Sequence, residues 1–110
     1  MNGILITNNP LAEKKYAGRV EIVYLENAML IDVLNYVRGK IHEGRKLLTH
    51  PLSGSVKPGQ TNYKSVMITK ETGELDVESL KIIEDSIAMS RKLMEDAQLI
   101  DLSLIAGGAL

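Results

Sequence analysis

The chain contains no cysteine, and this absence excludes several kinds of site at once. Without a thiol there is no disulfide, zinc–thiolate centre, iron–sulfur ligation or thiol catalysis. Phenylalanine and tryptophan are also absent, so among Phe, Tyr and Trp only four tyrosines are present. We therefore expect a core of aliphatic residues and methionine. A surface that stacks nucleic-acid bases on aromatic rings is poorly supplied.

An excess of charge of one sign is missing as well, since the formal net charge is -1. This balance argues against sequence-independent binding to nucleic-acid backbones, so we expect no nucleic-acid partner. The first ten residues carry no basic stretch and only a short apolar run, and no run approaches the length of a membrane span. We expect no signal peptide, no membrane association and a cytoplasmic location. With 110 residues and 45% apolar content, one domain with one core is expected.

Hydrophobic periodicity predicts an α/β protein. Continuous or alternating apolar runs predict strands at 3–7, 19–25, 46–49 and 64–69. Apolar stripes predict helices at about 28–43 and from 76 onward, with 11–16 either a short helix or an irregular connection. The connection from 19–25 through a helix to 46–49 is long enough for a right-handed parallel unit. We therefore predict a small, open, mainly parallel sheet of four to five strands flanked by helices, in a Rossmann-like three-layer arrangement.

The last twelve residues, 99–110, are apolar where chain termini are usually polar. We divide the chain into a single α/β domain at 1–98 and this apolar C-terminal segment. The segment is expected to be a fifth strand, a helix extension or a contact in an oligomer. A homo-oligomer is expected because such side chains are costly to leave in water.

The stretch 47–63 is the best candidate for a functional loop, because it is long, polar and lies between two apolar runs. It is not a phosphate-binding P-loop: Gln60 occupies the position of the required lysine, and a strand follows instead of a helix. Backbone N–H groups around Gly54 and the charge of Lys57 could still accept an anion. Together with the end of the first strand, the candidate ligand- or anion-binding residues are Asn8, Asn9, Thr49, His50, Ser53, Gly54, Ser55 and Lys57.

His50 is the best single candidate for a catalytic residue, because its charge can change near neutral pH. The sequence offers no Gly-x-Ser-x-Gly elbow and no identifiable acidic partner for it. A lone histidine before proline more often hydrogen-bonds the backbone, so the catalytic role is unknown. His42 and His50 have no nearby carboxylates at ligand spacing, and we predict no metal and no cofactor.

Three segments resemble the GrdX family: 6–10 (Ile-Thr-Asn-Asn-Pro), 48–58 (Leu-Thr-His-Pro-Leu-Ser-Gly-Ser-Val-Lys-Pro) and 63–65 (Tyr-Lys-Ser). The resemblance extends through the helix at 75–94 and so covers most of the chain. Members of this family accompany the glycine, sarcosine and betaine reductase systems of anaerobic bacteria that ferment amino acids. These reductase systems release acetyl phosphate. The resemblance implies an accessory or regulatory protein of reductive amino-acid metabolism. It transfers no catalytic residue, because the family's biochemical role is unsettled.

Three functional hypotheses follow, and we lean away from an enzyme. The first is an accessory protein that binds a glycine or betaine reductase component or a small anionic metabolite through the 49–63 loop. The second is a small hydrolase or phosphoryl-handling enzyme that uses His50. The third is a structural module that forms oligomers through the apolar C-terminal segment.

Overall fold

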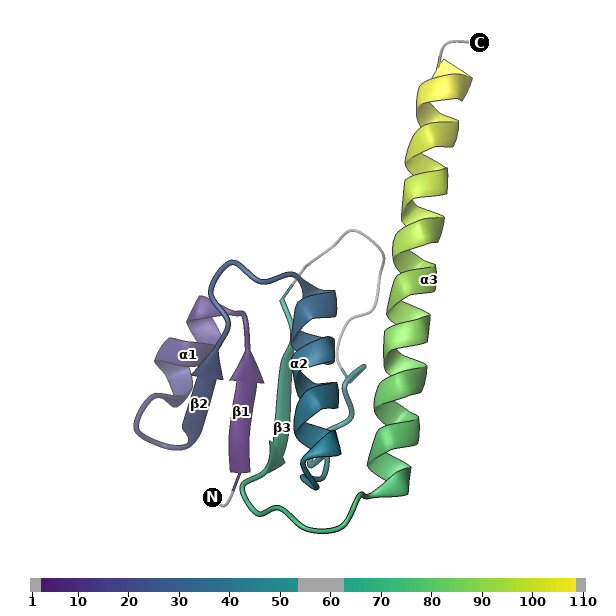
Figure 1. Ribbon diagram of the computed structural model, residues 1–110. Coiled ribbons are helices and arrows are strands. Elements are labelled where there is room, and N and C mark those ends of the chain that lie inside the picture. Colours follow the sequence, from purple (N-terminus) through teal and green to yellow (C-terminus); the bar gives the residue numbers. More distant parts are fainter. Residues whose placement is uncertain (1–2, 54–62, 109–110) are drawn as a thin grey trace.

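The computed structural model describes residues 3–53 and 63–108, with the backbone alone from residue 97 onward. Within these residues three strands and three helices follow one another along the chain (Figure 1). Their order is β1 (Gly3–Thr7), α1 (Pro10–Tyr16), β2 (Glu21–Tyr24), α2 (Leu30–His42), β3 (Ser65–Thr69) and α3 (Val77–Gly108).

The sheet of the described residues has the strand order β2-β1-β3 and is mixed. Strand β1 pairs in parallel with β2, and Leu5 lies opposite Ile22. It pairs antiparallel with β3, and Leu5 lies opposite Met67. The prediction of a four- to five-stranded, mainly parallel, Rossmann-like sheet is therefore wrong. The predicted strand at 64–69 exists, but it runs against β1 and occupies the position beside it.

The predicted strand at 46–49 is reduced to a single antiparallel bridge between Leu47 and Ile68. Backbone hydrogen bonds still join the segment to β3, from Leu48 N–H and Thr49 N–H to the Met67 carbonyl and from Thr69 N–H to the Lys46 carbonyl, but side chains bond the next backbone groups. The backbone N–H of Leu47 donates to Ser79 Oγ at 3.0 Å, and the N–H of Met67 donates to Thr49 Oγ1 at 3.0 Å. Backbone groups bonded to side chains cannot extend a strand ladder. Because this segment and β1 both run antiparallel to β3, the chain passes through it in the direction of β1.

Helix α2 lies between the sheet and α3 and forms the centre of the core. Its buried side chains recur every three or four residues, the spacing of one helical face. Helix α3 packs against α2 rather than on the sheet. The fully or almost fully buried core comprises Ile4, Ile6, Val33, Leu34, Val37, Ile41, Val66, Ile68, Ile83 and Ile87. An exposed ion pair, Arg38 Nε to Glu84 Oε1 at 2.5 Å, also joins the two helices.

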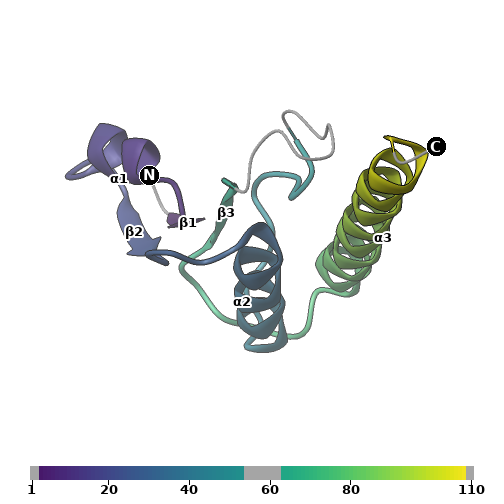
Figure 2. The same ribbon diagram turned by 90° about the horizontal axis from the view of Figure 1, so that it is seen from above.

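Helix α1 lies on the opposite side of the sheet from α2 (Figure 2). Pro10 occupies its first turn, where a missing N–H costs nothing, and Asn9 is its N-cap. The Asn9 side chain accepts a hydrogen bond from the N–H of Leu11 at 3.0 Å. The segment whose sequence fitted either a short helix or an irregular connection is thus helical, and its cap fixes where the chain turns after β1.

Helix α3 begins at a carboxylate cap and runs well beyond the sheet. Asp76 Oδ2 accepts hydrogen bonds from the N–H and Oγ of Ser79, and these bonds lower the pKa of Asp76. The helix has 32 residues, about 48 Å at 1.5 Å per residue, whereas α2 has 13. Its C-terminal half therefore extends past α2, as Figure 1 shows. The molecule is elongated accordingly, with extents of 56 × 32 × 19 Å.

Candidate functional site

The strand directions bring the two predicted parts of the site to one end of the sheet. Strands β1 and β2 end there, and antiparallel β3 begins there; we call this end the carboxyl edge. The segment Leu47–Thr49 runs in the direction of β1, so its following residue, His50, also arrives at this edge. Asn8 and His50, 42 positions apart in the sequence, therefore share an edge although the sheet is not the predicted one.

Asn8 is 3% exposed, and its side chain joins two segments of the edge. Its Nδ2 donates to the carbonyl of Ala28 at 2.8 Å, just before α2. Its Oδ1 accepts from the backbone N–H of Lys64 at 2.8 Å, just before β3. An amide that bonds two backbone groups in this way fixes the spacing of the loops that carry them.

Asn9, Thr7 and Ser65 form a second group of hydrogen-bonded polar residues near the end of β1. The backbone N–H of Asn9 donates to Thr7 Oγ1 at 3.0 Å, while its side chain caps α1. Thr7 is fully buried, and its hydroxyl lies 2.7 Å from the hydroxyl of Ser65 on β3. The hydroxyls and amides near the end of β1 thus bond to one another and to the backbone.

Thr49 and His50 hold the turn that leads out of the bridge at Leu47. Thr49 Oγ1 accepts from Met67 N–H, and His50 Nδ1 accepts from the backbone N–H of Leu52 at 3.1 Å. The carbonyl of His50 accepts from the N–H of Ser53 at 3.0 Å, and Pro51 is fully buried. Neutral His50 with Nδ1 engaged as an acceptor carries its proton on Nε2. In this tautomer the lone pair of Nδ1 is used by the turn at Leu52.

Three of the predicted anion-binding residues, Gly54, Ser55 and Lys57, lie outside the described residues. Ser53 is the last described residue before them and is exposed. Ser53 contacts the carboxyl edge through its backbone carbonyl rather than through its hydroxyl. That carbonyl accepts a hydrogen bond from Lys64 Nζ at 3.2 Å.

Sequence reasoning did not select Lys64 as a candidate site residue. The lysine is only 7% exposed, and burial lowers the pKa of its amine. Its backbone is held by Asn8, and its side chain reaches Ser53, so it contacts both parts of the edge. The signal in the sequence was a lysine directly before an apolar strand, a position that is usually solvated.

The other face of the edge carries negative charge. Tyr24 lies at the end of β2, opposite Thr7 in the register. Loss of solvation raises the pKa of Tyr24, and Glu26, Glu13 and Tyr63 raise it further. Side chains alternate between faces along a strand. Tyr24, Thr7 and Ser65 therefore share the face away from α2, and an anion would be repelled there more than beside Lys64.

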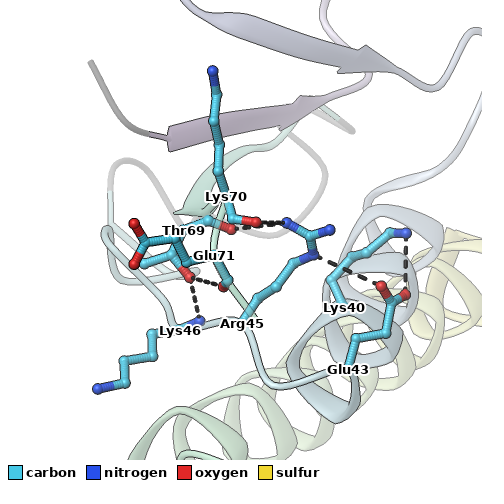
Figure 3. Close-up of polar contacts among 7 residues, drawn as sticks. All are labelled: Lys40, Glu43, Arg45, Lys46, Thr69, Lys70 and Glu71. Carbon is cyan, nitrogen blue, oxygen red and sulfur yellow. Dashed lines mark hydrogen bonds and ion pairs between the residues drawn. The ribbon is translucent and has the colours of Figure 1, made fainter. Parts of the chain in front are cut away.

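The opposite end of the sheet holds a separate polar cluster (Figure 3). Arg45 reaches from the end of α2 to the carbonyls of Thr69 and Lys70, and its Nε lies 3.7 Å from Glu43 Oε1. Thr69 Oγ1 accepts from the N–H of Lys46 at 2.9 Å and donates to the carbonyl of Glu71. The bonds of Arg45 and Lys46 to Thr69 and Lys70 tie the segment after α2 to the end of β3, so we interpret the cluster as structural.

A family model for GrdX-like protein matches residues 4–107. The chain belongs to the GrdX-like family. Membership implies an association with glycine reductase systems, in agreement with the resemblance of segments 6–10, 48–58 and 63–65. The match spans Asn8, His50 and Lys64 together, so the whole carboxyl edge lies within the family's common region. Neither a curated protein nor a solved structure matches the chain.

Two searches of the described residues bear on the function of this GrdX-like chain. No described helix is both long and apolar enough to cross a membrane. No group of three or more His, Asp or Glu side chains in the described part is placed to hold a metal ion. The chemistry that the described edge offers is hydrogen bonding by amides and hydroxyls, plus one buried amine.

Proposed function

We propose that this GrdX-like protein is a non-enzymatic accessory protein of glycine reductase systems. It binds a reductase component or a small anionic metabolite through the 49–63 loop at the carboxyl edge. The observation that carries the proposal is how the edge uses its side chains. The side chains of four of the five described candidates hydrogen-bond the backbone: Asn8, Asn9, Thr49 and His50.

This use of side chains suits binding better than catalysis. A nucleophile needs a base within hydrogen-bond reach and a group that orients the base. Here Nδ1 of His50, the described histidine of the edge, accepts a hydrogen bond from the backbone N–H of Leu52. The amides and hydroxyls of the edge hold the described ends of the loop, at His50 and Lys64, in fixed positions. Such pre-organisation lowers the entropic cost of binding.

Two measurements test the binding role. The first is co-purification of the tagged full chain from a host that expresses a glycine reductase system. The second is titration calorimetry with acetyl phosphate, inorganic phosphate and glycine. We expect either a reductase component in the first or a saturable heat in the second. The absence of both would overturn the proposal.

The enzyme hypothesis is tested by replacing His50 with glutamine. Because His50 is exposed and bonds only the local turn, we expect the melting temperature to change by no more than a few degrees. Acetyl phosphate hydrolysis is measured by the release of phosphate. We expect neither the wild type nor His50→Gln to hydrolyse acetyl phosphate faster than buffer alone. His42→Gln is the matched control, since His42 is exposed at the end of α2. Turnover that only His50→Gln loses, at an unchanged melting temperature, would favour an enzyme.

A second candidate function, oligomer formation, is favoured by the length of α3. The helix continues to Gly108, beyond the reach of α2, and the sequence from 99 to 106 is apolar except for Asp101 and Ser103. A helix that is apolar on all sides is normally buried. We expect a chain ending at residue 98 to form an assembly of fewer subunits than the full chain does, as measured by light scattering. The control removes only 109–110. The same number of subunits and the same melting temperature for all three chains would contradict this function.

A further inference from the structure

We propose that the Lys64 side chain is the anion-binding group of the carboxyl edge, and that it takes a small oxyanion such as a carboxylate or phosphate. This inference rests on the proposed binding function and narrows it to one residue and one class of ligand. Lys64 is the one described group of the edge that combines a donor with charge on the α2 side.

The position of Lys64 is fixed by the backbone rather than by its own side chain. Its N–H donates to Asn8 Oδ1 at 2.8 Å, and its carbonyl accepts from Asn8 N–H at 3.4 Å. The next residue, Ser65, begins β3 and is joined to Thr7 by their hydroxyls. A lysine so anchored presents its amine at a defined place, which is what recognition of a small ligand requires.

The amine has hydrogen-bonding capacity that the described residues do not use. An ammonium has three N–H donors. Among the described residues, one acceptor is recorded for it, the carbonyl of Ser53 at 3.2 Å. The ion pairs of the described part join Arg38, Lys40, Arg45 and Lys70 to carboxylates, and Lys64 is in none of them. The lowered pKa of its amine has loss of solvation as its cause, with no contribution from a carboxylate.

A purely structural role explains this arrangement poorly. The bond to Ser53 needs a single N–H, which a neutral glutamine could also provide. Burying a charge without a counter-charge is unfavourable, and such residues are kept mainly where they serve a function. An oxyanion supplies what is missing, because it brings a negative charge and acceptors for the remaining N–H groups.

The choice of ligand class follows from the surroundings. On the other face of the sheet, Glu13 and Glu26 act on Tyr24, so a large polyanion lying across the edge would meet repulsion. The whole chain has a net charge of -1, which gives no general attraction for polyanions. A compact anion can contact the Lys64 amine without approaching those carboxylates. Carboxylate and phosphate share this chemistry, and the test separates them.

The test compares Lys64→Gln and Lys64→Met with Lys70→Gln in the full chain. Lys70 is the matched control, because it directly follows the other end of β3 and its side chain is half exposed. Titrations with sodium phosphate and sodium acetate are made at constant ionic strength, with sodium chloride as the reference. Affinity is measured by calorimetry and stability by thermal unfolding.

We expect both Lys64 variants to bind the preferred anion roughly 10- to 100-fold more weakly, the loss expected for one charged hydrogen bond. Their melting temperatures without ligand should equal or exceed that of the wild type, because a buried charge is removed. Lys70→Gln should bind as the wild type does. Phosphate binding alone would assign a phosphate-bearing ligand, and acetate binding alone a carboxylate.

Other outcomes overturn the inference without deciding the proposed function. Wild-type affinity in Lys64→Gln means that the anion binds elsewhere. A lower melting temperature with unchanged affinity means that Lys64 is structural. If neither anion binds the wild type, Lys64 is not an anion site, and co-purification alone decides the accessory role. Should both variants fail to fold, the Cε–Hε signal of Lys64 in the wild type is followed by NMR during titration. A signal that does not move with either anion also refutes the proposal.

Discussion

Replacing Gly44 by alanine is expected to lower the free energy of unfolding by more than about 3 kcal/mol. Gly44 follows α2 with a φ of +97°, a region that side chains disfavour. A Cβ at this position would lie 2.0 Å from the carbonyl oxygen and 2.7 Å from the nitrogen of Gly73. The two backbones are held together, since Gly73 N–H donates to the Gly44 carbonyl at 3.0 Å. The clash therefore cannot relax without losing that hydrogen bond.

Gly39→Ala is the matched control for this prediction. Gly39 lies inside α2 and is exposed, and an added Cβ would meet no atom within 4 Å beyond its chain neighbours and the helix's own backbone. Alanine there should raise the free energy of unfolding by about 0.5–1 kcal/mol, because alanine loses less backbone entropy in a helix. Urea unfolding of both variants gives the comparison. Equal midpoints for Gly44→Ala and the wild type would contradict the close approach of Gly44 to Gly73.

The two glycines show what local sequence could predict. The pattern around Gly44 placed it correctly after a helix, because helix ends favour glycine in that backbone conformation. The contact with Gly73, 29 positions later, depends on where the chain lies after the end of β3. Local signals likewise predicted β1, the approximate extents of β2, α2 and β3, and the start of α3. Each of these elements is specified by periodicity or a cap within its own stretch.

Strand pairing was predicted wrongly for a reason that single stretches cannot reveal. A long connection through α2 suggested that 46–49 would join the sheet in parallel next to its neighbours. That segment does run in the direction of β1, but β3 lies between the two. The Thr49 side chain accepts from Met67 N–H of β3, and Ser79 Oγ accepts from Leu47 N–H on the side of the segment that faces away from β3. Both partners are distant in sequence, so no local pattern records them.

Residue types in the sequence indicated the polar side chains of the carboxyl edge but not its buried lysine. Asn8, Asn9, Thr49 and His50 were singled out because polar residues at strand ends often meet a ligand. In the structure their polar atoms bond backbone groups, which is the commoner use of asparagine and threonine at turns. Lys64 was overlooked because lysines are rarely buried, and its burial results from the packing of distant segments.

Replacing Asn8 by alanine is expected to lower the free energy of unfolding by about 2–4 kcal/mol. The change removes two hydrogen bonds of the Asn8 side chain, each 2.8 Å long. One is accepted from Lys64 N–H, and the other is donated to the Ala28 carbonyl. A buried backbone group left without a partner costs about 1–3 kcal/mol, and water recovers part of that cost. Urea unfolding measures the loss. Asn35→Ala is the control, since Asn35 is exposed on α2 and should change stability by less than about 0.5 kcal/mol.

The Asn8 variant also separates a structural role from a ligand role. Asn8 sets the position of the Lys64 backbone, so its loss should weaken anion binding indirectly, through a less defined amine. Asn8→Asp keeps the acceptor for Lys64 N–H but loses the donor to Ala28 and adds a negative charge. We therefore expect Asn8→Asp to bind anions more weakly than Asn8→Ala does at pH 7, since its carboxylate lies beside the Lys64 backbone. If Asn8→Ala were as stable as Asn35→Ala yet bound no anion, Asn8 would be a ligand contact rather than a support for Lys64.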